Sequence, residues 1–407
     1  MTKKWLVFVV GLLIAAGLVF RLYRFGEVPV ALYWDEVAIM IDARTVAATG
    51  SDMHGNHWLQ AIFPSYGDYK LPVYIWFASL AVKFFGASEW TVRLPSLLAG
   101  IGTIALSGLI VYELFFQLKK QQRRNLSWLA AGIAAISPWG IVFSRIGFEG
   151  FLGQFFLGLS VWLILKSRTN KRWLLGAVIF GALATYTYFS IRFVWPVLLV
   201  LGLWFVSDLQ KKTIKADLGK LFGQLIVSLL IYAALIFPIF RSPLYEPSQQ
   251  FRLSATSVLS SHDWALEANQ YREQAGNTFI DRAIYHRHLL LLRELTSNYA
   301  DHLDLSYLFF QGDDNLRHGT GQHGLFLSAM LVPFVVGWYG LANRKYWRQG
   351  FLLLGWWLIA LLPASVPEET PHALRSLNAL VPLTIVIGWG VWQLWRWFED
   401  RKSTRLN

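Results

Sequence analysis

The chain has 407 residues, of which 55% are hydrophobic and only 15% are charged, whereas a soluble domain carries about 25% charged residues. The formal charge of +12 fits cytoplasmic loops facing anionic headgroups, so membrane lipid is the expected partner of these cations and nucleic acid is not. With no cysteine, disulfides and thiolate metal sites are excluded. The mean hydropathy of +0.40 and the 20 tryptophans indicate a polytopic membrane protein with interfacial aromatic belts.

The first hydrophobic segment, residues 5–23, follows Lys3 and Lys4, which predict a cytoplasmic N-terminus. No small-residue cleavage site precedes Arg21, so the segment is expected to be an uncleaved transmembrane helix and not a signal peptide. Residues 24–91 are then predicted to form the first external loop.

An apolar segment inside this loop, residues 71–85, is short for the about 20 residues that a span requires, and it contains Lys83. If it crossed the membrane, the basic residues 119–124 would lie outside. If it lies flat on the outer leaflet, they lie inside with the other basic loops. We therefore predict an in-plane juxtamembrane helix for residues 71–85.

The remaining hydrophobic segments give an all-α polytopic membrane protein of about ten transmembrane helices, with both termini in the cytoplasm. Residues 241–322 are too polar to span and are predicted to be a long external loop region with its own short helices. The basic segments 119–124 and 208–220 then lie inside, and residues 1–407 form a single transmembrane domain. The further expected spans are 92–116, 128–143, 151–165, 173–189, 193–206, 221–240, 323–341, 351–362 and 372–397.

The predicted outer face collects three acids, Asp35, Glu36 and Glu149, with several cations and a tyrosine near helix ends. A carboxylate can take a proton from an attacking hydroxyl, and Arg and Lys can stabilise a leaving phosphate. This combination suits the transfer of a sugar from a lipid phosphate at headgroup depth. The candidate phosphate- and substrate-binding residues are Lys70, Arg93, Arg145, Tyr188, Arg192, His372 and Arg375.

Each candidate also has a structural explanation. Adjacent acids often face solvent or cap a helix, interfacial Arg and Lys anchor helices, and Tyr188 can belong to the aromatic belt. His54 and His57 could touch one metal ion, but the sequence places no third ligand beside them. No metal ligand and no cofactor is therefore predicted; a divalent metal is compatible with the sequence but is not indicated by it.

Several short motifs follow one another in a particular order along residues 5–192, with a weaker echo at residues 372–382. This order resembles the GT-C membrane glycosyltransferases, specifically the branch of protein O-mannosyltransferases and lipid A aminoarabinose transferases. The motifs are Trp34-Asp35-Glu36, Tyr69-Lys70-Leu71-Pro72, Arg93-Leu94-Pro95-Ser96, Ser137-Pro138, Ser144-Arg145 and Phe148-Glu149.

The resemblance implies roles for three residues. Asp35 corresponds to the catalytic base of the first loop, Glu149 to the second-loop acid that orients donor or acceptor, and Lys70 to the lysine that contacts the lipid phosphate. The chain has Lys-Leu-Pro where the family has Lys-Pro-Pro, and Glu149 where the family often has Asp. The family also places a flat helix in its first external loop, in agreement with residues 71–85.

The resulting hypothesis is an inverting glycosyltransferase of the plasma membrane, with its active site on the extracytoplasmic side. The donor would be a polyprenyl-phosphate-linked sugar and the acceptor a protein, lipid or glycan. The alternative is a transporter or flippase of a lipid-linked glycan, which predicts charges in mid-membrane and broken helices in matching halves. A third possibility is a non-catalytic partner in envelope assembly, which would tolerate the loss of Asp35 and Glu149.

Overall fold

A computed structural model describes residues 3–207, 214–261 and 263–405 of the chain. The expected cytoplasmic lysines Lys211 and Lys212 lie outside the described residues. The described chain is predominantly helical. Its one sheet is a hairpin of β1 (Phe63–Pro64) and β2 (Tyr69–Lys70), in which Phe63 pairs with Lys70. The all-α prediction is therefore confirmed.

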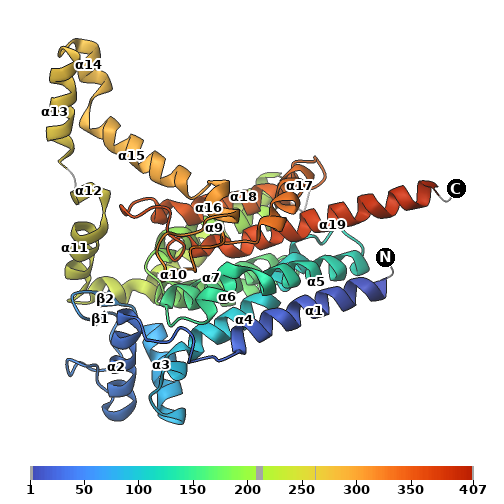
Figure 1. The fold of residues 1–407 in the computed structure, drawn as a ribbon, viewed down its shortest axis with the longest axis horizontal. Coiled ribbons are helices and arrows are strands. Elements are labelled where there is room, and N and C mark those ends of the chain that lie inside the picture. Colours follow the sequence, from blue (N-terminus) through green and yellow to red (C-terminus); the bar gives the residue numbers. More distant parts are fainter. Residues whose placement is uncertain (1–2, 208–213, 262, 406–407) are drawn as a thin grey trace.

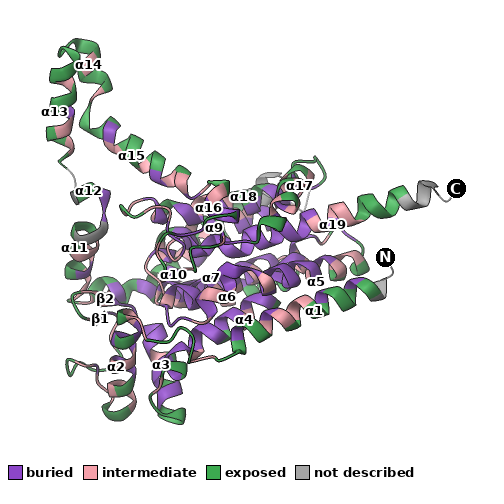
Figure 2. Ribbon diagram, viewed as in Figure 1, coloured by how far each residue is buried: buried purple, intermediate pink, exposed green. Residues whose placement is uncertain are grey.

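Long helices packed side by side form the body of the molecule (Figure 1). Both termini lie at one end of this bundle, whereas the hairpin and the helices that follow the first span lie at the opposite end (Figure 1). Figure 2 shows that the centre of the bundle is buried and that much of the first helix is exposed. The bundle helices include α1 (Lys3–Leu22), α4 (Glu89–Leu114), α5 (Lys120–Ile136), α7 (Glu149–Lys166), α10 (Ile214–Arg241) and α19 (Leu380–Arg405).

Five helices in the described part of the chain are long and apolar enough to cross a membrane, and a sixth span results if one bent pair is counted. Four shorter apolar helices accompany them, which together indicate a polytopic membrane protein; the number of ten spans stays a prediction. The five candidate spans are Trp5–Leu22, Glu89–Leu114, Glu149–Lys166, Gly219–Arg241 and Leu377–Arg401. The shorter helices are α3 (Pro72–Phe85), α8 (Trp173–Thr185), α9 (Ile191–Ser207) and the segment Ser328–Leu341.

The helix α3 packs on α2 (Trp34–Thr49) at the end of the bundle. In Figure 1 both helices run across the direction of α1 and α4. This orientation agrees with the in-plane helix expected for residues 71–85.

The bent pair is a difference from the expected continuous span 128–143. The helix α5 ends at Ile136 and α6 (Pro138–Ser144) continues at an angle of 60°. Pro138 lacks an N–H and disfavours a helical conformation at the residue before it, and Ser137 is accordingly extended, with ψ of 120°. The Ser137 hydroxyl accepts the N–H of Gly140 and so caps the new helix.

Two C-terminal helices begin later than expected. The helix α17 (Leu331–Leu341) starts two residues before Pro333, and α19 starts two residues before Pro382. Both prolines thus lie in the first turn of their helices, where the missing N–H costs no intrahelical hydrogen bond, and this agrees with the observed starting points. The residues from His372 to Ser376, expected inside a span, therefore form an irregular segment ahead of α19.

The polar region 241–322 contains several short helices, as expected. Part of it, from α13 to α15, projects away from the bundle as a largely exposed arm (Figures 1 and 2). The helical patch expected near residues 281–295 is divided at Tyr285. The helices of this region are α11 (Tyr245–Thr256), α12 (Val258–Ser261), α13 (Trp264–Ala275), α14 (Phe279–Ile284), α15 (Arg287–Asp301) and α16 (Leu305–Phe309); α18 (Trp347–Leu361) belongs to the bundle.

Candidate active site

The first turn of α2 carries both acids of the Trp34-Asp35-Glu36 motif. The Glu36 carboxylate accepts the N–H of Tyr33 at 2.9 Å, which caps the start of the helix, and the position of both acids suits the helix dipole. Consecutive helix residues point in different directions. Asp35 is therefore 28% exposed, whereas Glu36 is 1% exposed.

Glu36 forms a buried ion pair with Arg93 of α4. Arg93 Nε lies 2.8 Å from Glu36 Oε1 and Arg93 Nη2 lies 3.2 Å from Oε2. Glu36 Oε1 also accepts the N–H of Gly147 at 2.7 Å. The remaining Arg93 donors bind carbonyl oxygens of Gly26, Pro29 and Ala31. The pair thus joins α2, α4, the segment after α1 and the loop before α7.

Lys70 of β2 lies at the centre of a second group of charges. Its ammonium nitrogen is 2.6 Å from Asp35 Oδ1, 3.7 Å from Asp68 Oδ2 and 3.9 Å from Glu149 Oε1, the first residue of α7. Burial alone would lower the pKa of Lys70, but the charges of Glu149, Asp35 and Asp68 raise it above its ordinary value. Lys70 is therefore a permanent cation between three acids, and we call these four residues the Lys70 cluster.

Two arginines flank the ring of Phe189 beside this cluster. The guanidinium carbon of Arg192 is 3.7 Å from the ring centroid and that of Arg252 is 4.7 Å from it. Arg252 also donates to the Tyr69 carbonyl at 2.9 Å and lies 3.9 Å from Asp68. Within the described chain, the buried Nε and Nη1 of Arg192 have no hydrogen-bond acceptor. An anionic oxygen would satisfy them.

Tyr188 and Arg375 lie on the α7 side of the cluster. A Cβ atom added at Gly153 would lie 2.8 Å from Tyr188 Cβ, so residue 153 must be glycine for Tyr188 to pack against α7. Burial raises the pKa of Tyr188 to about 12, against the opposing charge of Arg375. Tyr188 thus remains a hydrogen-bond donor near neutral pH. Arg375 Nη1 donates to the Glu369 carbonyl at 3.3 Å.

The predicted cation Arg145 is directed elsewhere. Its guanidinium donates to the carbonyl oxygens of Phe20 at 2.6 Å, Arg21 at 3.0 Å and Val28 at 2.9 Å. The carbonyl groups of Phe20 and Arg21 lie in the last turn of α1, where the helix itself supplies no donors, and that of Val28 lies in the segment that follows. Arg145 therefore anchors α1 and does not join the Lys70 cluster.

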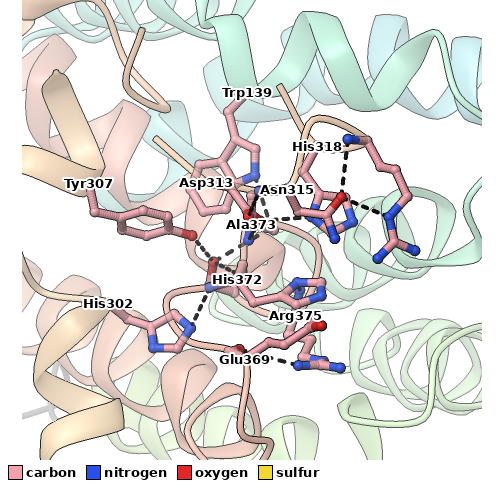
Figure 3. Close-up of polar contacts among 12 residues, drawn as sticks. Trp139, His302, Tyr307, Asp313, Asn315, His318, Glu369, His372, Ala373 and Arg375 are labelled. Carbon is pink, nitrogen blue, oxygen red and sulfur yellow. Dashed lines mark hydrogen bonds and ion pairs between the residues drawn. The ribbon is translucent and has the colours of Figure 1, made fainter. Parts of the chain in front are cut away.

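The predicted substrate-binding residue His372 is 6% exposed and lies in another polar cluster (Figure 3). His318 Nδ1 is 2.7 Å from Asp313 Oδ2, and the ring centroids of His318 and His372 are 4.4 Å apart. Asp313 Oδ2 also accepts the N–H of Ala373 at 2.7 Å, and His302 Nε2 accepts the N–H of His372 at 3.1 Å.

This cluster is also the one group of three potential metal ligands among the described residues. Ligand atoms of Asp313, His318 and His372 all lie within 4.8 Å of one another. The histidine pair His54 and His57, weighed from the sequence, belongs to no such group in the described chain.

The structure thus brings together Asp35, Lys70 and Glu149, with Tyr188 near Glu149 and Arg375. Arg192 is linked to this group through Phe189 and Arg252. It places Glu36, Arg93, Arg145 and His372 in other contacts. Four residues of these clusters were not selected from the sequence: Asp68, Arg252, Asp313 and His318. The turn-rich stretch from Gly312 to Gly324 could have indicated a tight polar loop, whereas nothing near Arg252 marked it among the charges of the long region.

Comparison with known proteins agrees with the resemblance noted from the sequence. The family model for dolichyl-phosphate-mannose-protein mannosyltransferase matches residues 69–237. "Putative mannosyltransferase YkcB" of Bacillus subtilis (strain 168) is 31% identical over 110 residues, which are 26% of this chain and 14% of that protein.

Two solved structures share the fold over nearly the whole chain. ArnT from Cupriavidus metallidurans bound to undecaprenyl phosphate is 14% identical, with a TM-score of 0.54 over 96% of this chain and 60% of that one. The archaeal oligosaccharyltransferase AglB from Archaeoglobus fulgidus, in complex with an inhibitory peptide and a dolichol-phosphate, is 12% identical, with a TM-score of 0.54 over 98% of this chain and 52% of that one.

The chain spans only about half to three fifths of these two structures and a much smaller part of YkcB. It nevertheless has the fold of the GT-C membrane glycosyltransferases, and its residues 69–237 match the family of dolichyl-phosphate-mannose-protein mannosyltransferases.

Proposed function

We propose that the protein is an integral-membrane glycosyltransferase that moves a monosaccharide from a polyprenyl phosphate to an acceptor hydroxyl, with inversion at the anomeric carbon. One observation carries the proposal. A partly exposed carboxylate, Asp35, is held 2.6 Å from a buried lysine, and the unsatisfied donors of Arg192 share the ring of Phe189 with Arg252, which lies 3.9 Å from Asp68 of the Lys70 cluster. A base and an anion-binding group are the two functions that this reaction needs.

Asp35 is the general base of the proposed reaction. The acceptor hydroxyl attacks the anomeric carbon and forms the new glycosidic bond, while its proton passes to Asp35. The bond between the anomeric carbon and the phosphate oxygen breaks, and the polyprenyl phosphate leaves with the electron pair. Lys70 fixes Asp35 through Oδ1 alone, and the side chain is open enough to receive a hydroxyl.

The leaving phosphate is stabilised by cations and needs no proton. Arg192 can offer Nε and Nη1 to phosphate oxygens, with Arg252 on the same Phe189 ring. The undecaprenyl phosphate in the ArnT structure and the dolichol-phosphate in the AglB structure support a lipid-phosphate donor for this fold. Glu149 and Tyr188 remain candidates for holding the sugar or the acceptor, and Arg375 for holding the donor.

Four predicted site residues take supporting roles in this proposal. Glu36 and Arg93 fix the start of α2 and thereby the position of Asp35. Arg145 anchors the end of α1, and His372 belongs to the buried cluster shown in Figure 3. Each acts through the protein and not on the substrate.

The proposed chemistry takes place on the extracytoplasmic side of the plasma membrane. Two observations support this side. The Lys70 cluster lies near the hairpin, at the end of the bundle opposite both termini (Figure 1). Lys3 and Lys4 favour a cytoplasmic N-terminus by the positive-inside rule.

One feature of the structure favours the transporter alternative in part: α5 and α6 form a broken helix. A transporter built on repeats would place a matching break in its second half. In the described part of the chain, α5 and α6 are the one bent pair that passes as a span. The enzyme is therefore the better supported function.

The test uses purified protein in lipid nanodiscs with a panel of radiolabelled polyprenyl-phosphate sugars. Release or transfer of sugar is compared between wild type, Asp35→Asn and the control Glu27→Gln, which changes an acid whose side chain is 66% exposed. We expect Asp35→Asn to lower turnover by about 10²–10⁴-fold, as loss of a general base does, and Glu27→Gln to leave it unchanged.

Full turnover by Asp35→Asn would refute its role as base. Movement of labelled lipid between leaflets in proteoliposomes, without release of sugar from any donor, would favour the transporter.

A further inference from the structure

We propose that Asp313, His318 and His372 form a zinc site that ties the loop of residues 310–324 to the segment preceding α19. The three side chains offer two imidazole nitrogens and one carboxylate oxygen, a ligand set that zinc commonly takes. The site is separate from the Lys70 cluster, and zinc binding does not depend on the proposed glycosyl transfer.

The ligands converge in a buried place. The exposed fractions of Asp313, His318 and His372 are 6%, 4% and 6%, and their ligand atoms lie within 4.8 Å of one another. Figure 3 shows the two imidazole rings next to each other beside the carboxylate. Among the described contacts no hydrogen bond joins the two rings, although their centroids are 4.4 Å apart. A cation bound here would displace the hydrogen bond between His318 Nδ1 and Asp313, and His372 would contribute its Nε2, because its Nδ1 accepts the N–H of Arg375 at 3.4 Å.

Two of the three ligands border a small cavity. Its volume of about 10 Å³ is close to what one water molecule needs, and it is lined by Asp313 and His318 together with His323 and Trp139, whereas His372 does not line it. Zinc binds nitrogen and oxygen at about 2.0–2.2 Å, which places neighbouring tetrahedral ligands about 3.3 Å apart. The 2.7 Å separation of Asp313 Oδ2 and His318 Nδ1 must therefore widen by about half an ångström as zinc replaces the proton between them.

The surroundings of the carboxylate resemble the outer shell of a metal site. Asp313 Oδ2 accepts the N–H of Ala373 at 2.7 Å, and Oδ1 accepts the N–H of Asn315 at 2.8 Å. Such hydrogen bonds orient a ligating carboxylate. The positive charges of Arg317 and Arg375, which are close enough to act on His372, oppose a dication. The charge of Asp313 is therefore essential to the site.

The site has a structural consequence for α2. The same loop carries Arg317, which donates to the Tyr33 hydroxyl and lies over the Tyr33 ring. Tyr33 is the N-cap residue of α2, two residues before Asp35. The tight path of the loop depends on Gly312, whose φ of +79° favours glycine and whose added Cβ would lie 2.5 Å from the His323 carbonyl oxygen. Zinc would fix this loop and act as a positioning element.

The test measures zinc on the full chain, purified in nanodiscs with a tag that contains no histidine. The protein is stripped with a chelator, reloaded with zinc chloride alone and passed through a desalting column. We expect close to one zinc per chain by elemental mass spectrometry, and Co²⁺ loaded in its place should give the visible absorption of a tetrahedral nitrogen–oxygen site. Mg²⁺ should not compete, because its preferred ligands are oxygens.

Four variants locate the metal. Asp313→Asn, His318→Ala and His372→Gln should each lower zinc affinity, measured against a fluorescent chelator, by at least about tenfold. The control His54→Ala/His57→Ala removes two histidines from another loop and should bind zinc like wild type. His372→Gln preserves the volume and hydrogen bonding of the side chain. If His318→Ala does not fold, the zinc affinity of His372→Gln tests the site in its place.

The proposal is overturned if stripped wild type takes up no zinc. It is equally overturned if His372→Gln and Asp313→Asn bind zinc like wild type, or if the His54→Ala/His57→Ala control is the variant that loses it.

Discussion

Substitution of Glu36, which forms a buried pair with Arg93, can show whether Glu36 positions α2 or acts on the substrate. We consider Glu36→Gln, which keeps the size of the side chain but removes its charge. Arg93 is fully buried and would lose the single carboxylate that balances it. Gln also has one acceptor oxygen where Glu36 has two, whereas Arg93, Tyr33 and Gly147 all donate to this side chain.

The expected cost follows from this burial. Removing one partner of a buried ion pair typically destabilises a protein by about 3–5 kcal/mol, because an uncompensated charge remains inside. That is a factor of more than about 10² in a folding equilibrium. The double variant Glu36→Gln/Arg93→Met removes the stranded charge as well, and its cost should be smaller than the sum of the two single variants.

The measurement is thermal unfolding in nanodiscs, followed by tryptophan fluorescence and by recovery of monodisperse protein. Asp35→Asn is the matched control. It changes the neighbouring, partly exposed acid and should cost less than Glu36→Gln, because Lys70 keeps Asp68 and Glu149 as partners. If Glu36→Gln melts like wild type yet loses turnover to the same degree as Asp35→Asn, Glu36 acts on the substrate and the positioning argument is refuted.

Two further predictions concern Asp42 and Arg192. Burial raises the pKa of Asp42 from 3.8 to about 6 in the folded state, so the folded state binds more protons than the unfolded state in this window and stability falls as the pH rises through it. Asp42→Asn should raise the melting temperature at pH 7 and reduce this slope in melts recorded from about pH 4 to pH 7; an unchanged slope would contradict it. Arg192→Gln should raise KM for the lipid-phosphate donor by about 10- to 100-fold, since hydrogen bonds between charged groups contribute about 1.5–3 kcal/mol. The exposed control Arg241→Gln should leave KM unchanged, and equal effects of both variants would place the phosphate elsewhere.

Hydrophobic runs were sufficient to predict the helical fold, because segments that are apolar over this length are buried in the membrane as helices. The first span and α4 begin and end within a few residues of their predicted bounds. The same runs do not show where the backbone of a helix bends or begins. The break at Ser137 and the late starts of α17 and α19 depend on single prolines inside segments that are apolar throughout.

The site could be predicted in part for a similar reason. Motif order pointed to Asp35, Lys70 and Glu149, which the structure brings together. Charge alone could not distinguish Asp35 from Glu36. Consecutive residues of a helix point in different directions, so Asp35 reaches the Lys70 cluster whereas Glu36 enters the buried pair with Arg93. Arg252 and His318 reach their clusters only through tertiary contacts between segments distant in sequence.

The bend between α5 and α6 has a consequence for biosynthesis. The N–H of Trp139 donates to the Leu325 carbonyl, and its indole N–H donates to the Ala373 carbonyl. Both acceptors are synthesised long after the bent helix has left the ribosome. The N-terminal helices therefore enter the membrane before the two N–H groups of Trp139 have their acceptors. These hydrogen bonds form only after the C-terminal part of the chain has been inserted. Until then the nascent bundle depends on water or on the insertion machinery to satisfy these groups.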